Sequence, residues 1–481
     1  MLSDREVFSE WKGKIIQGTI NQGCPQGGVL SPLLWILVVD ELIQILDEDG
    51  VVTEGYADDF VILVSGKYEE VLPDLLEQAL KKVQRWCEAN SLAVNPNKTE
   101  IVVFTRKYKC KVKELITFYR RQVPYAEGVK YLGVYLDKKL YWTTHLQMQC
   151  RKVLNMFMQC RSAIGTGWGL DPQKTLWIYR AILIPKLTYA AIVWWKTTEK
   201  VTLQKELDHI QAIILRGTFR LKRSTPTAAV RMMLDEAGLD LVIKGCAAKA
   251  AYRLTCLKEW VENGMGHTTI KKMLPGGLCS AIQDKISKHI LFRRRYKTII
   301  PEREKWRKNE VLGHGDIWFT DWSKGENGTG FGICGPKRSL DSSHKLREYN
   351  TVFQAEMAAI GTCASKLLLE KVVGRVIRIC TDSQASIMAL ETPISNSALV
   401  KEVKKTLNDL AAGNKLYITW IPGHSGYKGN ARADKLAKQG AEMKAAPTRE
   451  VGMPYREGCG KIDETLEKER WHNWNLTEAY R

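Results

Sequence analysis

Short apolar segments separated by Gly, Asn and Ser turns alternate with helical patterns after residue 315. Period-2 alternation and apolar runs predict strands, whereas apolar residues three and four apart predict helices. The order is three strands, a helix, a strand, helices, a strand and a helix, which indicates a mixed sheet covered by helices. The predicted strands are 316–324, 328–335, 344–350, 376–382 and 416–423, and the predicted helices are 352–371, 400–410 and 431–441.

The first 140 residues have a different pattern, with strands at both ends of a helix. Residues 14–23 alternate like a strand, and 31–46 are apolar at helical spacing. Residues 55–64 then predict a strand pair that turns at two adjacent aspartates. A helix over 69–90 follows, and the strand-like segments 92–105 and 129–137 end this part.

The segment from about 140 to 260 is helical and rich in Leu, Ile, Ala and Trp. Its most membrane-like run, 176–195, contains Arg180, Lys186 and a central Pro185. We therefore expect a buried helix of a soluble domain here, with no membrane partner. Residues 285–308 carry a net charge of +8, from ten Lys and Arg against two Glu. Two interpretations of this basic stretch stay open, an interdomain connection and a solvated helix face.

The composition narrows the class of partner. The 481 residues carry 72 Lys and Arg against 53 Asp and Glu, a formal net charge of +19. An excess of this size favours a polyanion, either nucleic acid or an anionic membrane surface. The 12 cysteines form no CxxC pair and no signal peptide begins the chain, so we expect reduced thiols inside the cell, in the nucleus or cytoplasm.

Four acidic residues of the C-terminal part lie in apolar surroundings, where an unpaired charge is costly. Asp321 is in the first predicted strand, Glu356 in the first turns of the long helix, Asp382 at the end of the fourth strand, and Asp434 in the last helix. The ends of neighbouring strands converge, so these acids are expected to meet. Two Mg²⁺ ions held by four carboxylates would clamp the attacking and leaving oxygens of a phosphodiester.

The loop before Asp434 contains a histidine between glycines. Gly423, Gly426 and Gly429 surround His424 in the segment PGHSGYKGN. A histidine on such a loop is suited to moving a proton.

The segments TDWSKGENGTGFG, FQAEMAAI, CTDSQAS and GHSGYKGNARADKLAK, in this order, resemble the ribonuclease H family over about 316–442. The resemblance implies that the four acids are metal ligands, that His424 is the family's loop histidine, and that Mg²⁺ is the cofactor, with Mn²⁺ expected to substitute. Two positions depart from the family pattern. Trp322 stands where Gly is common, and Ala431 stands where Glu is frequent.

The N-terminal part resembles the palm of reverse transcriptases. The resemblance rests on QGCPQGGVLSPLLW (22–35), YADD (56–59), NPNKTEIVVF and KYLGVYLD. It implies that Asp58 and Asp59 hold metal near the nucleotide triphosphate and that Lys98 protonates the leaving pyrophosphate. Gln26, Gly27 and Gly28 are expected to leave room for the backbone to approach a base pair. The helical region to about 260 resembles the thumb and connection of non-LTR retrotransposon polyproteins.

The family's other palm aspartate lies upstream of the QG segment, and the acids before it here are Asp4, Glu6 and Glu10. We expect that the third palm carboxylate and the fingers are absent, that the chain is the 3′ part of a retrotransposon reading frame, and that it extends no primer.

The predicted fold class is a multidomain α/β and α+β protein. It combines a truncated polymerase palm, a helical thumb and connection, and a ribonuclease H fold with a five-stranded mixed sheet. The leading hypothesis is hydrolysis of the RNA strand of RNA–DNA hybrids. A working polymerase and a non-catalytic nucleic-acid-binding remnant are the alternatives. The predicted boundaries are 1–136 for the palm, 137–284 for the thumb and connection, 285–312 for a basic linker, 313–445 for ribonuclease H and 446–481 for a tail.

Overall fold

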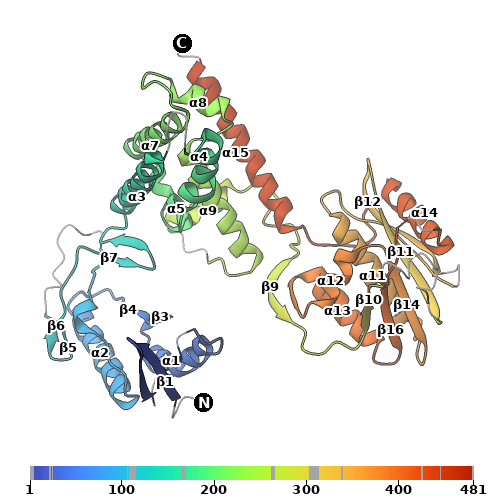
Figure 1. The fold of residues 1–481 in the computed structure, drawn as a ribbon, viewed down its shortest axis with the longest axis horizontal. Helices are drawn as coiled ribbons and strands as arrows, with labels where there is room; N and C mark the ends of the chain where they lie inside the picture. Colours follow the sequence, from blue (N-terminus) through green and yellow to red (C-terminus); the bar gives the residue numbers. More distant parts are fainter. Residues whose placement is uncertain are drawn as a thin grey trace. The chain divides into compact units, whose positions relative to one another are not determined.

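The computed structural model divides into two compact units, Met1–Met148 and Gln149–Arg481 (Figure 1). Each unit is described by itself. The structure describes the whole chain except residues 1–4, 21–22, 24, 26, 106, 108–114, 164–168, 262–265, 303–311, 313, 337–339, 424–425, 445 and 479–481.

In its described residues, the first unit contains two long helices and four strand pairs. Helix α1 (Ser31–Asp47) and helix α2 (Leu72–Ala89) enclose a core that includes Leu46, Val83 and Trp86. The hairpin of β3 (Val52–Tyr56) and β4 (Asp59–Leu63) packs beside α1. The other pairs are β1 (Arg5–Trp11) with β2 (Lys14–Ile20), β5 (Thr117–Phe118) with β6 (Arg121–Gln122), and β7 (Gly128–Tyr131) with β8 (Val134–Asp137).

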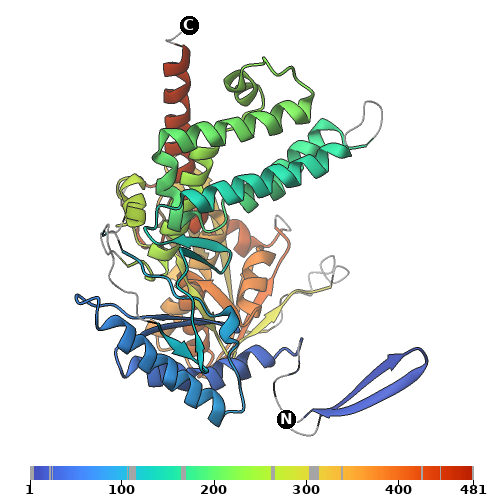
Figure 2. The same ribbon diagram turned by 90° about the vertical axis from the view of Figure 1, so that its left-hand side faces the viewer.

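The β1–β2 hairpin is exposed along nearly its whole length and stands apart from the rest of its unit in Figure 2. The strand expected over 92–105 is not formed in the described residues. A 3₁₀ turn, Pro96–Lys98, begins at Asn95, whose side chain accepts a hydrogen bond from Asn97 N. Pro96 lacks the N–H that a continuous strand would need, so the turn interrupts the apolar pattern.

The second unit begins with a layer of helices. Helix α7 (Val201–Phe219) and helix α9 (Leu239–Cys256) bury Leu207, Ile214 and Ala251 between them and their neighbours. The remaining helical segments are α3 (Thr143–Ser162), α4 (Pro172–Ile178), α5 (Ile184–Leu187), α6 (Ala191–Trp194), α8 (Thr227–Met233) and the 3₁₀ segments Trp195–Glu199 and Gly266–Met273.

The run 176–195 is buried in places, but it is not the single helix that the sequence predicted. It passes from α4 through a π-helical turn, Tyr179–Leu183, into α5, and Ala190 has a positive φ of 53°. A proline at the start of α5 and a left-handed residue before α6 break the helix. The described chain has one unbroken helix long and apolar enough to cross a membrane, Val352–Leu369, and 61% of that window is buried in the protein.

A six-stranded sheet follows, in the order β10-β16-β14-β11-β12-β13. Strands β11 (Asp316–Gly325), β12 (Gly328–Cys334) and β13 (Ser342–Lys345) are antiparallel neighbours. Strand β14 (Val376–Thr381) pairs in parallel with β11, and β16 (Lys415–Trp420) pairs in parallel with β14. Five strands were expected, of which the third, β13, lies at Ser342–Lys345 and not at 344–350, and a sixth strand joins them.

Helices cover this sheet. Helix α11 (Val352–Leu369) packs on β11 and β12, and on α13 (Ala398–Leu410). Helix α14 (Lys428–Glu442) packs on β11 and β12, whose glycines permit a close approach. A Cβ atom at Gly330 or Gly332 would collide with the backbone of α14. A short helix, α12 (Gln384–Glu391), follows β14.

The sixth strand comes from the basic stretch for which a connection or a helix face was expected. Strand β10 (Lys297–Ile299) pairs in parallel with β16, and β9 (Lys285–Ile290) pairs antiparallel with β15 (Ile394–Ser397). Tyr296 is 2% exposed and belongs to the core of the sheet domain. The described part of this stretch is therefore built into the fold.

Residues after 446 also pack on the second unit. Val451 is buried in the core beneath the sheet. Helix α15 (Tyr455–Glu478) lies along α9, where Tyr455 stacks on Tyr252 at 5.4 Å between ring centroids. Ion pairs from Lys244 to Glu469 and from Lys249 to Asp463 join the same two helices.

Candidate metal centre

Asp321 lies in the middle of β11, opposite Gly332 of β12, and is 6% exposed. Its Oδ1 atom accepts a hydrogen bond of 2.8 Å from the Trp322 backbone N–H. The position is set by strand periodicity, because residues two apart on a strand face the same side of the sheet.

Glu356 is the fifth residue of α11 and is 1% exposed. The helix begins with a capping box, in which the Thr351 side chain accepts from Gln354 N and the Gln354 side chain accepts from Thr351 N. This start fixes the first turns, so that Glu356 reaches the end of β14. There its Oε2 atom accepts a hydrogen bond of 2.8 Å from Thr381 Oγ1.

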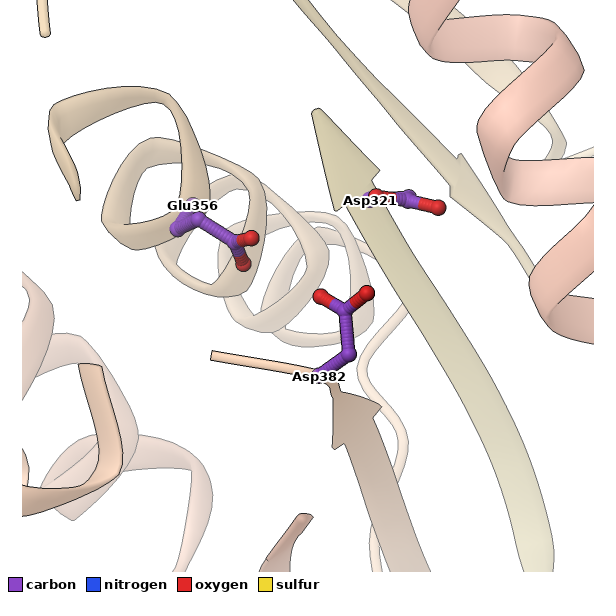
Figure 3. Close-up of side chains that lie close together, drawn as sticks. All are labelled: Asp321, Glu356 and Asp382. Carbon is purple, nitrogen blue, oxygen red and sulfur yellow. The ribbon is translucent and has the colours of Figure 1, made fainter. Parts of the chain in front are cut away.

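Asp382 follows directly after Thr381, the last residue of β14. Its backbone carbonyl accepts a hydrogen bond of 2.9 Å from the indole N–H of Trp420, at the end of the neighbouring strand β16. Asp321, Glu356 and Asp382 each offer a carboxylate oxygen, and these three oxygens lie within 4.8 Å of one another. Figure 3 shows the three side chains around one space between α11, β11 and the end of β14.

Burial and mutual repulsion strongly perturb these acids. Burial, followed by the charge of Asp382, raises the pKa of Asp321 to about 7, and the Asp434 carboxylate adds to the rise. Burial and the charges of Asp382 and Asp321 raise the pKa of Glu356 well above its usual range, whereas the Thr381 hydrogen bond lowers it. Three carboxyl groups held this close are expected to bind a cation, since a cation would relieve both effects.

Asp434 is the seventh residue of α14 and lies outside the group of three. Its Oδ2 atom accepts a hydrogen bond of 2.7 Å from Lys438, four residues further along the helix. Its charge nevertheless reaches Asp321, as the raised pKa of Asp321 shows. Lys438 interacts with both acids, and its pKa is raised by the hydrogen bond to Asp434 and by the Asp321 charge.

Comparison with known protein families identifies the domain in which these acids lie. Residues 314–442 match the family model described as RNase H, and residues 5–136 match that described as Reverse transcriptase (RNA-dependent DNA polymerase). The chain carries a reverse transcriptase domain followed by an RNase H domain. The three clustered acids all lie in the RNase H domain.

The relatives of the chain are proteins of non-LTR retrotransposons. A "Putative 115 kDa protein in type-1 retrotransposable element R1DM" of Drosophila melanogaster is 27% identical over 247 residues, 51% of this chain and 24% of that protein. A "Retrovirus-related Pol polyprotein from type-1 retrotransposable element R1" of Bradysia coprophila is 24% identical over 237 residues, 49% of this chain and 24% of its own. The chain thus spans about a quarter of the length of these two relatives.

Solved structures match about a quarter of the chain. One is a foamy viral protease-reverse transcriptase in complex with dsDNA, 21% identical, with a TM-score of 0.23 over 27% of this chain and 97% of that chain. Another is RNase H1 from the archaeon Halobacterium salinarum, 18% identical, with a TM-score of 0.21 over 26% of this chain and 96% of that chain.

The first of the two departures in the RNase H domain has a structural explanation. Trp322 has an ordinary strand conformation opposite Phe331, and its side chain packs partly buried against the domain core. The position needs no positive φ, so Trp is tolerated there without strain. Ala431, the second departure, is exposed on α14.

His424 lies outside the described residues. The preceding residue, Gly423, is next to the metal centre, because a Cβ atom placed on it would lie 3.0 Å from Asp382 Oδ2. The main chain therefore passes the Asp382 carboxylate one residue before His424, and a side chain at position 423 would crowd it.

The reverse transcriptase residues are placed differently. Asp58 and Asp59 lie at the exposed turn of the β3–β4 hairpin, which Trp35 holds by donating a hydrogen bond of 2.6 Å to the Ala57 carbonyl. Among the described residues, no third metal-ligating side chain forms a close group with these two. Lys98 is exposed at the end of a 3₁₀ turn, and Gln26 lies outside the described residues.

Sequence reasoning missed two residues of the centre, Thr381 and Lys438. Thr381 is fully buried and hydrogen-bonded to Glu356. Its position as the last strand residue before Asp382 was visible in the sequence. Lys438 is spaced four residues from Asp434, which is the spacing of a helical ion pair and could have been recognised.

Proposed function

We propose that the RNase H domain hydrolyses the RNA strand of RNA–DNA hybrids by a two-metal mechanism. The observation that carries this proposal is the convergence of Asp321, Glu356 and Asp382 within 4.8 Å, in a domain that matches RNase H. Neither burial nor crowding of three acids stabilises a fold by itself, so a ligand is the better explanation.

The donor set fits Mg²⁺, with Mn²⁺ as a substitute. Carboxylate oxygens are hard ligands, and Mg²⁺ binds through a few carboxylates and substrate phosphate oxygens. The pKa of Asp321, raised to about 7 by burial and by Asp382, is a further sign of uncompensated negative charge. Two bound ions would supply Lewis-acid stabilisation of the phosphoryl oxygens and a more acidic attacking water.

We assign distinct tasks to the residues of the chain. Asp321, Glu356 and Asp382 would hold the ions, and the charge of Asp382 acts on both of the other two acids. Asp434 would contribute its carboxylate after it exchanges Lys438 for metal. His424 is proposed to take a proton to or from the reacting oxygens. Thr381 positions Glu356 through its hydrogen bond of 2.8 Å.

The proposed substrate is an RNA–DNA hybrid, and the proposed compartment is the nucleus or cytoplasm. The excess of 72 basic over 53 acidic residues favours a polyanionic partner. Reverse transcription of RNA produces hybrids of this kind, and the chain carries a domain that matches the reverse transcriptase family.

The test is cleavage of hybrid by the full chain. RNA labelled at one end and annealed to DNA should be cut in the presence of Mg²⁺, and EDTA should stop the reaction. Single-stranded RNA and duplex DNA should stay intact. The matched pair of variants is Asp382→Asn, expected to be inactive, and Asp409→Asn, a surface carboxylate on α13 expected to cut normally. Equal cutting of single-stranded RNA, or activity in Asp382→Asn, would refute the proposal.

A polymerase is the second candidate, favoured by the match of residues 5–136 to the reverse transcriptase model. Asp58, Asp59, Gln26 and Lys98 would be its residues. Primer extension on the same preparation tests it, with Asp58→Ala as the inactive control. If neither extension nor cleavage is observed while hybrid still binds, the chain is a non-catalytic nucleic-acid-binding protein.

A further inference from the structure

The segment between β9 and β10 presents an aromatic side chain among arginines. Phe292 is 93% exposed, and Arg293, Arg294 and Arg295 follow it directly. Residues 285–297 contain three lysines and three arginines and no acidic residue. An isolated exposed Phe needs no explanation, but one displayed beside this much positive charge does.

The backbone of this segment is firmly held. The Asn408 side chain bridges it, since Nδ2 donates to the Arg293 carbonyl and Oδ1 accepts from Arg295 N, both at 2.9 Å. Tyr296 is buried, and its hydroxyl donates to the Leu390 carbonyl at 3.0 Å. Leu291 N donates to the Pro393 carbonyl at 2.9 Å. The exposure of Phe292 is thus a property of a fixed loop.

The three arginine side chains differ in the contacts that they make within the protein. Arg294 donates to Thr298 Oγ1 and lies over the Tyr296 ring, so it is used within the fold. Arg293 and Arg295 are exposed and form no ion pair or side-chain hydrogen bond with the described part of the chain. These two guanidinium groups therefore keep their donors for a ligand.

A groove of about 430 Å³ lies between β9 and α13. Strand β9 ends at Ile290, two residues before Phe292. Lys288, His289, Lys401 and Lys405 line it, together with one acid, Glu402. Glu402 is itself neutralised, because Arg449 donates to it at 2.9 Å. The three lysines have no ion-pair partner among the residues that the structure describes, so the groove carries net positive charge.

We propose that this segment and groove form a second nucleic-acid site, which binds a single-stranded polynucleotide leading to or from the hybrid. Phe292 stacks on an unpaired base, Arg293 and Arg295 contact the flanking phosphates, and the lysines of the groove follow the backbone. Single-strand sites combine aromatic platforms with basic grooves of this kind. The segment with Phe292 lies outside the region 314–442 that matches RNase H, although the groove lysines of α13 lie within it, and binding of a single strand is a further activity beyond the proposed hydrolysis.

Binding of fluorescent hybrids by the full chain in EDTA tests the site without cleavage. A hybrid with a single-stranded DNA or RNA tail should bind more tightly than a blunt hybrid. Phe292→Ala should remove most of this advantage, roughly 5- to 100-fold in Kd, and Phe292→Trp should keep it. Replacing Arg293 and Arg295 by Ala should reduce the slope of log K against log salt by about 1.4, as expected for two phosphates of a single strand.

Matched surface variants provide the controls. Val373→Ala removes another exposed apolar side chain, and Arg375→Ala another exposed arginine, and neither should change binding of the tailed hybrid. Circular dichroism should show every variant folded. Equal affinity of the parent and Phe292→Ala for the tailed hybrid would overturn the proposal. The proposal would also be overturned if Phe292→Ala lost binding to phosphatidylserine vesicles but bound the tailed hybrid as the parent does. The site would then be a membrane contact.

Discussion

Thr381 Oγ1 donates a hydrogen bond of 2.8 Å to Glu356 Oε2, which joins the end of β14 to the first turns of α11. Both residues are almost completely buried. The same hydroxyl oxygen accepts from Ser383 N at 3.2 Å, so it also fixes the backbone on the far side of Asp382. Thr381 thus orients two of the three clustered acids without being a ligand itself.

Replacing Thr381 by Val should weaken metal binding more than folding. The hydroxyl lowers the pKa of Glu356, so its loss should raise that pKa further and favour the protonated, non-binding form. Loss of such an orienting partner typically costs about 10- to 100-fold in metal affinity. Calorimetric titration with Mg²⁺ measures it, and Thr381→Ser, which keeps the hydroxyl, should bind nearly as well as the parent. A Thr381→Val protein with unchanged affinity would show that Glu356 needs no such partner.

Asp382→Asn should abolish hydrolysis and leave the metal-free protein at least as stable. Asp382 is the largest charge acting on both Asp321 and Glu356, so its neutralisation removes repulsion from the folded state. Thermal unfolding in EDTA should give an equal or higher Tm than the parent, with Asp409→Asn as a neutral control. A marked drop in Tm, with activity surviving in the folded fraction, would assign Asp382 a structural task instead.

The metal-free protein should lose stability as the pH rises from about 4 to 7. The pKa of Asp321 is about 7 in the folded state and that of Glu356 is also raised, so the folded protein holds protons that the unfolded chain releases near pH 4. The stabilising contribution is therefore complete below pH 4 and is lost as the pH passes through the folded pKa values. Urea unfolding in EDTA across this range measures the slope.

Added Mg²⁺ should reverse this dependence, because metal binds the deprotonated carboxylates and its affinity rises with pH. Asp382→Asn should flatten the slope in EDTA, since the Asp382 charge is a main cause of the raised pKa values. A metal-free stability that rises between pH 4 and 7, for this domain's own transition, would contradict the placement of the acids.

His424→Ala should lower turnover by roughly 10²- to 10⁴-fold, the usual contribution of a positioned acid–base group. Affinity for the hybrid should hardly change, because the residue is proposed to move a proton and not to bind. Single-turnover cleavage and equilibrium binding separate the two effects. His314→Ala, at an exposed position before β11, is a suitable control. Unaltered turnover would show that His424 takes no part in catalysis.

The sequence predicted β11, β14 and β16 and the long helices of the RNase H sheet well, because these elements have a clear hydrophobic pattern. The third strand was predicted at 344–350 but lies at Ser342–Lys345, which contains no apolar residue. Asp321, Glu356 and Asp382 were recognisable as acids in apolar surroundings, and the structure brings them together. Asp434 was expected in the same group, but its partner in the structure is Lys438. Residues four apart on a helix lie one turn apart and can form an ion pair, as Asp434 and Lys438 do. The family motif around Asp434 indicated a metal ligand, so this simpler pairing was not predicted.

Strands β9 and β10 were missed for a different reason. Their charge density is that of a solvated segment, and only Tyr296 and a few apolar residues reveal that one side is buried. The partner strands β15 and β16 lie more than 100 residues away along the chain. Pairing over that distance leaves no local signal, so a basic stretch that completes a sheet resembles a linker.

The folded RNase H domain is expected to need residues on both sides of 313–445. Asp284 is buried and caps α13, since its Oδ1 atom accepts from Leu399 N and its side chain from Ser397 Oγ, each at 2.9 Å. The Asp284 Oδ2 atom also accepts from Gln354 at 3.2 Å, which links the cap to the start of α11. Val451, on the other side, fills the core.

Asp284→Ala should therefore destabilise the full chain by about 1–3 kcal/mol, from the lost cap and the lost hydrogen bond of Gln354, whose Nε2 keeps its bond to the Gly452 carbonyl. Asp409→Ala, on the exposed side of α13, should change little. A fragment of residues 313–445 should unfold at a lower urea concentration than one of residues 281–456, which keeps Asp284, β9, β10 and Val451. Equal urea midpoints for the two fragments, together with unchanged stability of Asp284→Ala, would show that the flanking strands and the cap are dispensable. The strands from β11 to β16 and their helices would then be sufficient for the stability of the domain.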